Sequence, residues 1–125
     1  MIETHGITSY DEDLFTALAA LSKLRSKILV LVITQYYNKF DDIYKFYTFI
    51  KGLVNPSVVY GHLMKLMAHH DVKKVKRGYY VPTKRGLKKI KYYWLIKKMI
   101  PEEFVSDMAK EVEIKIRVGN EVITL

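Results

Sequence analysis

The sequence predicts an α+β domain, mainly helical, in which one helix leads into a two-stranded hairpin and the hairpin into another helix. The dipeptide Asn55-Pro56 starts the first of these helices, with Asn as N-cap and Pro at the first helical position. Residues 72–76 and 79–81 are short runs rich in β-branched, aromatic and cationic residues, and Arg77-Gly78 forms the turn between them. Thr83 is the predicted N-cap of the next helix.

Two helices are expected at the beginning of the chain. Ser9-Tyr10-Asp11-Glu12 has the form of a capping box, which predicts a helix over residues 10–21. A second helix is predicted over residues 24–38. It contains an unbroken apolar run, so we expect it to be buried on nearly all sides.

The central part of the chain predicts two helices joined by a short turn. A helix over residues 41–50 is followed by a turn that contains Gly52, and then by the helix over residues 56–69. Two helices with such a connection fit the helix-turn-helix rule. The second of them has an apolar stripe at helical spacing, which consists of Val59, Leu63 and Leu66. We expect that stripe to be packed and the opposite face to be free.

The C-terminal part predicts a long helix, a short helix and a second hairpin. The helix after Thr83 is expected to end near Met99, because a proline soon afterwards disfavours helical geometry. A short helix then reaches about Lys110. Apolar and charged residues alternate over residues 112–118, and a Gly-Asn turn links them to residues 121–125. An isolated hairpin is marginal in water, so it must pack on the body or pair with a partner's edge.

Composition indicates one packed domain with two terminal extensions: residues 1–21 as an N-terminal arm and helix, 22–99 as the central domain, and 100–125 as a C-terminal helix and hairpin. Half of the residues are apolar and 16 are aromatic, enough for a core without metal or disulfide staples. The chain has no cysteine, which excludes disulfides and cysteine-rich zinc sites. Without a long apolar segment or a basic signal peptide, we expect a cytoplasmic protein and no membrane partner.

The positive charge is concentrated in one segment. The formal net charge is +8, and residues 72–98 contain eleven Lys or Arg and no Asp or Glu. Residues 1–22, in contrast, contain four acidic residues and no Lys or Arg. The predicted hairpin and the helix after it should therefore attract a polyanion, and nucleic acid is the obvious candidate.

The order of helix, basic hairpin and helix is that of a winged helix-turn-helix, and residues 22–99 resemble winged-helix regulators of the ArsR, MarR and PadR type. In those proteins a Tyr-x-x-Thr-x-x-Gly signature leads from the wing into the next helix; here it stands as Tyr80-Val81-Pro82-Thr83-Lys84-Arg85-Gly86. The glycine that commonly closes the recognition helix is replaced by His70, for which a left-handed cap is less favourable. The Lys-, Ile- and Tyr-rich composition resembles that of hyperthermophilic archaea and their viruses or plasmids.

The resemblance implies a sequence-specific DNA-binding transcriptional regulator, associated with the nucleoid, with a recognition helix at residues 56–69 and a wing at 72–81. The second half of the helix after Thr83 is apolar around most of its circumference, so we also expect a homodimer, formed through residues 87–100 and the N- or C-terminal extension. The predicted DNA contacts come from the exposed helix face, the wing and the start of the next helix: Ser57, Tyr60, Gly61, His62, Lys65, Lys73, Lys74, Lys76, Arg77, Lys84 and Arg85.

Individual side chains suggest different parts in such an interface. Gly61 permits close approach, Ser57 at the helix start can reach a phosphate, and Arg77 at the hairpin tip can enter the minor groove. The helix has no Arg, Asn or Gln, which are the side chains that make bidentate contacts to guanine or adenine. Most of the affinity is therefore expected from cations and counterion release.

Two other functions stay open, and catalysis is not expected. A weakly specific architectural or partition-type protein would coat DNA, and a winged helix used as a protein adaptor would meet an acidic partner. The histidines have no cysteine or carboxylate at a spacing that completes a metal site, so no metal or cofactor is expected. No phosphate loop or nucleophile motif indicates an enzyme. Tyr92-Tyr93-Trp94 is typical of a core or dimer interface more than of a ligand pocket.

Overall fold

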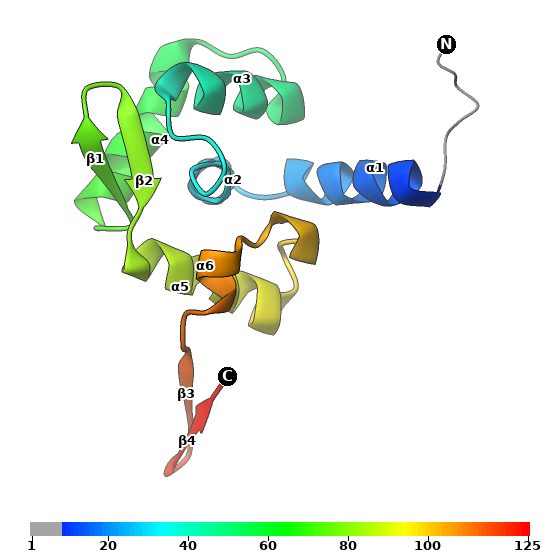
Figure 1. Ribbon diagram of the computed structural model, residues 1–125, viewed down its shortest axis with the longest axis vertical. Helices are drawn as coiled ribbons and strands as arrows, with labels where there is room; N and C mark the ends of the chain where they lie inside the picture. Colours follow the sequence, from blue (N-terminus) through cyan, green and yellow to red (C-terminus); the bar gives the residue numbers. More distant parts are fainter. Residues whose placement is uncertain (1–8) are drawn as a thin grey trace.

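The computed structural model describes the backbone of residues 9–125 and the side chains from residue 13 onward, and its fold is α+β and mainly helical, as predicted (Figure 1). The helices before the first hairpin are α1 (Ser9–Ser22), α2 (Ser26–Ile33), α3 (Phe40–Lys51) and α4 (Pro56–Ala68). The hairpin consists of β1 (Val72–Lys76) and β2 (Tyr79–Pro82), and α5 (Lys84–Tyr92) follows it. The side chains of the capping box expected at residues 9–12 lie outside the described ones.

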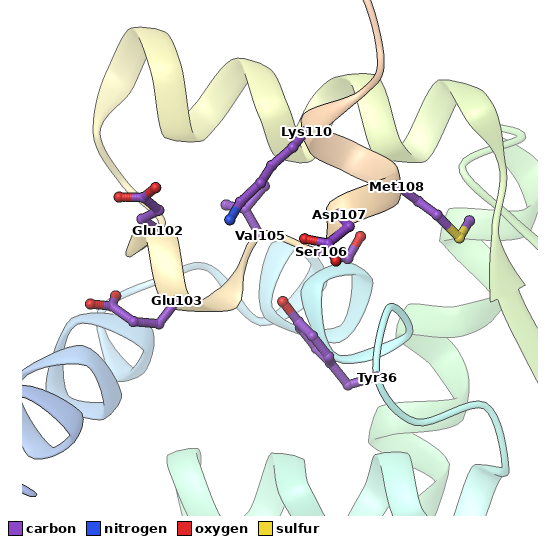
Figure 2. A pocket seen from close by; sticks show the side chains of 8 residues that line it. All are labelled: Tyr36, Glu102, Glu103, Val105, Ser106, Asp107, Met108 and Lys110. Atoms are coloured by element: carbon purple, nitrogen blue, oxygen red, sulfur yellow. The ribbon is translucent and has the colours of Figure 1, made fainter. Parts of the chain in front are cut away.

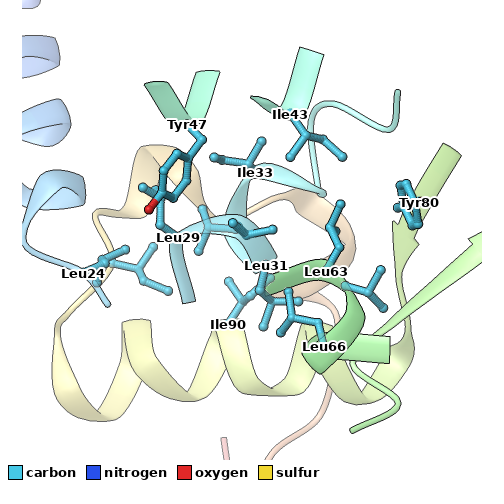
Figure 3. Packing of buried hydrophobic residues seen from close by; sticks show 14 of the residues in the cluster. Leu24, Leu29, Leu31, Ile33, Ile43, Tyr47, Leu63, Leu66, Tyr80 and Ile90 are labelled. Carbon is cyan, nitrogen blue, oxygen red and sulfur yellow. The ribbon is translucent and has the colours of Figure 1, made fainter. Parts of the chain in front are cut away.

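Helix α2 is the centre of the hydrophobic core (Figure 3). Its residues 29–33 are all buried, so the prediction of burial on nearly all sides is confirmed. Side chains from the three neighbouring helices pack around it: Ile43 and Tyr47 from α3, Leu63 and Leu66 from α4, and Ile90 from α5. This arrangement fixes α4 against the core through one face and leaves the other face outward.

Helix α2 ends at Ile33, earlier than predicted; a turn over residues 34–36 follows it, and the chain before α3 is then hydrogen-bonded to the first hairpin. The N–H of Phe40 donates to the carbonyl of Gly78 at 2.8 Å, and the N–H of Tyr80 donates to the carbonyl of Asn38 at 2.8 Å. The Asn38 side-chain amide also donates to the Tyr80 carbonyl at 3.0 Å. The hairpin is thereby attached to the α2–α3 connection as well as to α4.

Helix α4 ends in a Schellman motif with His70 in the left-handed position, at a φ of 61°. The His70 N–H donates to the Met67 carbonyl at 3.0 Å, and the Asp71 N–H donates to the Leu66 carbonyl at 2.9 Å. These bonds satisfy carbonyls at the helix end that have no partner within the helix. A side chain other than glycine carries a steric cost in this conformation, as the sequence indicated.

Thr83 connects the start of α5 to the end of α4. Its hydroxyl donates to the His70 carbonyl at 2.5 Å and accepts the Gly86 N–H at 3.1 Å, and its own N–H donates to the Asp71 carbonyl at 2.9 Å. Tyr80 is buried three residues earlier. The Tyr-x-x-Thr-x-x-Gly signature therefore has a physical reason here. Tyr80 is a buried anchor, Thr83 caps α5, and Gly86 lies against the backbone of Asp71.

Two further predicted helices, after the first hairpin, differ in extent from the observed ones. Helix α5 ends at Tyr92 and continues as a single π-helical turn, η2 (Tyr93–Lys97), rather than as an α-helix to Met99. The helix expected up to Lys110 is instead a 3-10 turn, η3 (Glu102–Phe104), and a separate short helix, α6 (Asp107–Lys110). The two are separate because Ser106 is extended and caps α6, accepting the Ala109 N–H at 3.2 Å.

Two polar side chains attach this C-terminal segment to the body. The Gln35 amide donates to the Phe104 carbonyl at 2.9 Å and accepts the Ser106 N–H at 3.0 Å. The buried Lys91 ammonium donates to the Lys110 carbonyl at 2.9 Å and to the Val112 carbonyl. The segment after α5 is thus attached both to the turn that follows α2 and to α5.

The predicted second hairpin is present and extends away from the body (Figure 1). Strands β3 (Lys115–Val118) and β4 (Glu121–Thr124) pair antiparallel, with Ile116 opposite Ile123. All of β4 is exposed. The hairpin does not pack along the body. Its pairing with the sheet edge of a partner, the other expectation, stays a prediction. Within residues 9–125 no helix has the length and apolar character to cross a bilayer.

Candidate nucleic-acid interface

The exposed face of α4 carries mainly small and apolar side chains. The predicted stripe of Val59, Leu63 and Leu66 is buried, which turns the opposite face outward. Five residues at helical spacing form this outward face: Ser57, Gly61, Met64, Lys65 and Ala68. Three of them were predicted as contacts from the sequence. Met64 and Ala68 were not predicted, because they have neither a hydrogen-bonding side chain nor the missing side chain that suggested close approach at Gly61.

Tyr60 and His62, also predicted contacts, lie at opposite edges of α4 and do not share its central face. Tyr60 is 44% exposed and lies toward the first hairpin. His62 is half-buried beside the Tyr47 ring, at 6.2 Å between ring centroids. Burial lowers the pKa of His62, and the charges of Lys65 and Lys27 lower it further. At neutral pH His62 therefore carries less positive charge than an ordinary histidine and adds little to the attraction for an anion.

The cations of the first hairpin point to its two sides. Lys74 pairs across the hairpin with the buried Tyr80 and therefore lies on the side that faces the body. Between Lys74 and Lys76 the strand register shifts at a β-bulge, which turns Lys76 to the opposite side. There the Lys76 ammonium lies 4.4 Å from the centroid of the Tyr79 ring. Lys73 is on that outer side too, so only Lys74 among these three faces α4.

The hairpin and α4 meet around a hollow of about 420 Å³. Its lining consists of Lys39, Phe40, Asp41, Tyr60, Lys74, Arg77, Gly78, Tyr79 and Tyr80. Phe40 packs edge-on against the Tyr60 ring, at 6.3 Å between centroids. The lining contains three cations, Lys39, Lys74 and Arg77, and one carboxylate, that of Asp41. The rim is therefore positive and favours an anionic group. The predicted contacts Tyr60, Lys74 and Arg77 are thereby brought together.

Lys39 was missed by the sequence prediction. It precedes α3 and lies far from the hairpin along the chain, but it forms an isolated antiparallel bridge with Tyr79 and lines the same hollow. No local pattern of residues signals a long-range bridge of this kind. The position of Lys39 follows only from the hydrogen bonds that attach the loop before α3 to the hairpin.

At the start of α5 the cations have different surroundings. Lys84 is exposed. The Arg85 Nε lies 3.6 Å from Oδ1 of Asp71, and the Lys89 Nζ lies 2.6 Å from Oδ2 of the same buried carboxylate. Arg85, a predicted contact, keeps 65% of its side chain exposed. Lys89 and Lys91 are occupied within the chain, whereas Lys88, Lys97 and Lys98 are exposed farther along the basic segment.

A second hollow has the opposite charge (Figure 2). It encloses about 660 Å³ between the α2–α3 connection and the C-terminal segment, and Glu102, Glu103 and Asp107 lie around it with Tyr36 and Lys110. Burial, together with the charge of Asp107, raises the pKa of Tyr36. This acidic surface disfavours a polyanion. Among the described residues, no group of three His, Asp or Glu side chains is arranged to hold a metal ion.

No protein-family model, no curated protein and no solved structure matches this chain. The function is therefore inferred from the geometry and the charge of the chain itself.

Proposed function

We propose that the chain is a winged-helix DNA-binding protein that regulates transcription, rather than an enzyme. Helix α4 would be the recognition helix in a major groove, and the β1–β2 hairpin would be the wing beside the phosphate backbone. One observation carries the proposal: Tyr60 of α4 and the hairpin cations Lys74 and Arg77 line a single hollow with a positive rim. The helix and the basic hairpin therefore meet on one surface. The protein would act in the cytoplasm, on the nucleoid.

The affinity would come mainly from the cations. Each phosphate that a lysine or arginine neutralises releases condensed counterions, so binding weakens steeply with salt. The exposed side chains that supply this charge on the hairpin are Lys73, Lys74, Lys76 and Arg77. Lys65 would add one cation on the exposed face of α4, and Lys84 another at the start of α5.

We also propose a homodimer, which would match a pseudo-palindromic DNA site. The support is apolar surface outside the core: Tyr92 and Ile96 are exposed on the last part of α5 and on η2, and Val122 and Ile123 are exposed on β4. A second copy would cover these side chains. Sedimentation equilibrium or light scattering tests this part separately from DNA binding.

The test of the function is an anisotropy titration against a random duplex and the DNA upstream of the protein's own gene, across a salt series. The regulator predicts a preference for its own upstream DNA of more than about a hundredfold, or roughly 2.7 kcal/mol. Absence of binding to any duplex at low salt would reject DNA binding. A protein adaptor would then be the better interpretation.

A second candidate, an architectural or partition-type DNA-coating protein, is favoured by the chemistry of α4. The helix contains no Arg, Asn, Gln, Asp or Glu, and it therefore lacks the groups that hydrogen-bond strongly to base edges. Equal, steeply salt-dependent binding to every duplex, with a footprint that spreads from any starting site, would favour this candidate.

A further inference from the structure

The polar groups on the exposed face of α4 are fewer than its sequence suggests. The Ser57 hydroxyl donates to the side-chain carbonyl of Asn55 at 2.9 Å, and that same oxygen accepts the Ser57 N–H at 3.0 Å. Ser57 is thus engaged in capping its own helix. Lys65 is then the polar side chain left on the central face, and a flexible ammonium contacts phosphates more readily than it selects a base.

Apolar atoms occupy the rest of this face. Met64 is 46% exposed, and Ala68 lies one turn beyond it on the same side. Val58, which is 42% exposed, lies beside Lys65 at the edge of this face. Methionine is unbranched and polarisable, so it adapts to an irregular apolar surface. An exposed apolar helix face with cations beside it fits a ligand that is anionic at its edges and apolar within.

Duplex DNA with thymine in the major groove has this combination. The C5 methyl group of thymine is an apolar group at the floor of that groove, and guanine and cytosine present only hydrogen-bonding groups there. We propose that α4 recognises thymine methyl groups, so that the protein prefers A·T-rich duplex. This inference rests on the proposed DNA-binding function and specifies its substrate.

Gly61 supports a close approach. It lies in the middle of a helix, where glycine is less favourable than alanine, yet a Cβ built on it meets no described atom within 4 Å. The packing of the chain therefore gives no reason for a glycine here. A glycine between Ser57 and Met64 lets the helix backbone come nearer to the floor of a groove, and this brings Met64 and Ala68 within reach of the methyl groups.

The tip of the hairpin is consistent with the same preference. Arg77 is exposed at the turn. Runs of A·T pairs narrow the minor groove and strengthen its negative potential, which attracts arginine. A duplex rich in A·T pairs would therefore suit both the helix and the hairpin tip.

The experiment compares four duplexes of equal length at one salt concentration: an A·T-rich duplex, the same duplex with deoxyuridine in place of thymine, a G·C-rich duplex, and that duplex with 5-methylcytosine. Deoxyuridine removes the methyl group and leaves the hydrogen-bonding groups and the charge unchanged. We expect weaker binding by about fourfold for each contacted methyl group lost. We also expect 5-methylcytosine to strengthen binding to the G·C-rich duplex.

The outcomes separate this inference from the function on which it rests. Equal affinity for the thymine and deoxyuridine duplexes, or tighter binding to the G·C-rich duplex, overturns the inference and leaves DNA binding intact. No binding to any of the four overturns both.

A pair of variants tests whether α4 is the recognising element. Met64→Ala should bring the affinities for the thymine and deoxyuridine duplexes closer together. The matched control is Met108→Ala, which changes an exposed methionine on α6 and should leave the ratio as in the wild type. A Met64→Ala protein with an unchanged ratio would overturn the inference.

Discussion

Gly86 lies so close to the backbone of Asp71 that a Cβ on it would stand 2.1 Å from the Asp71 carbonyl oxygen. That oxygen also accepts the Thr83 N–H, so it is fixed where α4, β1 and α5 meet. The obstacle is backbone rather than a movable side chain. The glycine that ends the Tyr-x-x-Thr-x-x-Gly signature is therefore required by packing, independently of any ligand.

Gly86→Ala should consequently destabilise the protein by about 1–3 kcal/mol, because the first turn of α5 must move away from Asp71. Urea unfolding measures the loss, and Gly61→Ala is the matched control because its added methyl group meets open space. A Gly86→Ala protein of wild-type stability would contradict the close contact.

Gly61→Ala should separate stability from binding. We expect the free energy of unfolding to rise by about 1 kcal/mol, because alanine is favoured over glycine inside a helix. DNA affinity should fall, because the new methyl group lies on the face that would approach the groove. Paired urea and anisotropy measurements test this, and a variant that is more stable and binds equally well would remove Gly61 from the interface.

His70→Gly should stabilise the protein by about 1 kcal/mol, because the left-handed conformation at the end of α4 costs a side chain free energy that glycine avoids. The control is His69→Gly, at a position with a φ of −90° that needs no glycine. Chemical denaturation of both variants checks the difference. Equal effects at the two positions would argue against a strained His70.

Arg77→Ala should weaken binding to every duplex and reduce the salt slope by about one unit for the lost phosphate contact. Arg117→Ala makes the same change on the β3–β4 hairpin, and it should leave the slope as in the wild type. Binding titrations at several salt concentrations give both slopes. An unchanged slope for Arg77→Ala would exclude the hairpin tip from the interface.

Acid should destabilise the native state through His62, whose pKa in the folded protein lies below its ordinary value of 6.5. Below about pH 6.5 the unfolded chain binds a proton that the folded chain resists. The free energy of unfolding therefore decreases as the pH decreases. His62→Gln should reduce this loss in melting curves between about pH 5 and 7. The control is His69→Gln, which changes an exposed histidine; a similar effect there would argue against His62 as the cause.

The sequence predicted the features that depend on local pattern. The buried stripe of α4 followed from the spacing of Val59, Leu63 and Leu66, and the first hairpin followed from its turn and its β-branched residues. The outward positions of Ser57, Gly61 and Lys65 followed from the same spacing. These features depend on the spacing of apolar residues in helices and strands, and that spacing can be read directly from one sequence.

The features that depend on distant segments could not be predicted. The β-bulge that turns Lys76 outward has no local signal, and Lys39 reaches the hollow only through a long-range bridge. The pairing of Arg85 and Lys89 with Asp71 joins the end of α4 to α5. The hydrogen bonds from Gln35 to Phe104 and Ser106 join the turn after α2 to the C-terminal segment. Each requires knowledge of which elements lie side by side.

The way in which the first hairpin is attached affects how the protein can vary. The bond from Phe40 to Gly78 uses only backbone atoms, and Gly78, at a φ of 80°, occupies a conformation that favours glycine. The neighbouring Arg77 neither makes this hydrogen bond nor has a positive φ, and its side chain is exposed at the turn. A change in a single codon there can raise or lower the attraction for a polyanion while the hairpin is retained. The strength of the proposed binding can therefore change at this position without loss of the fold.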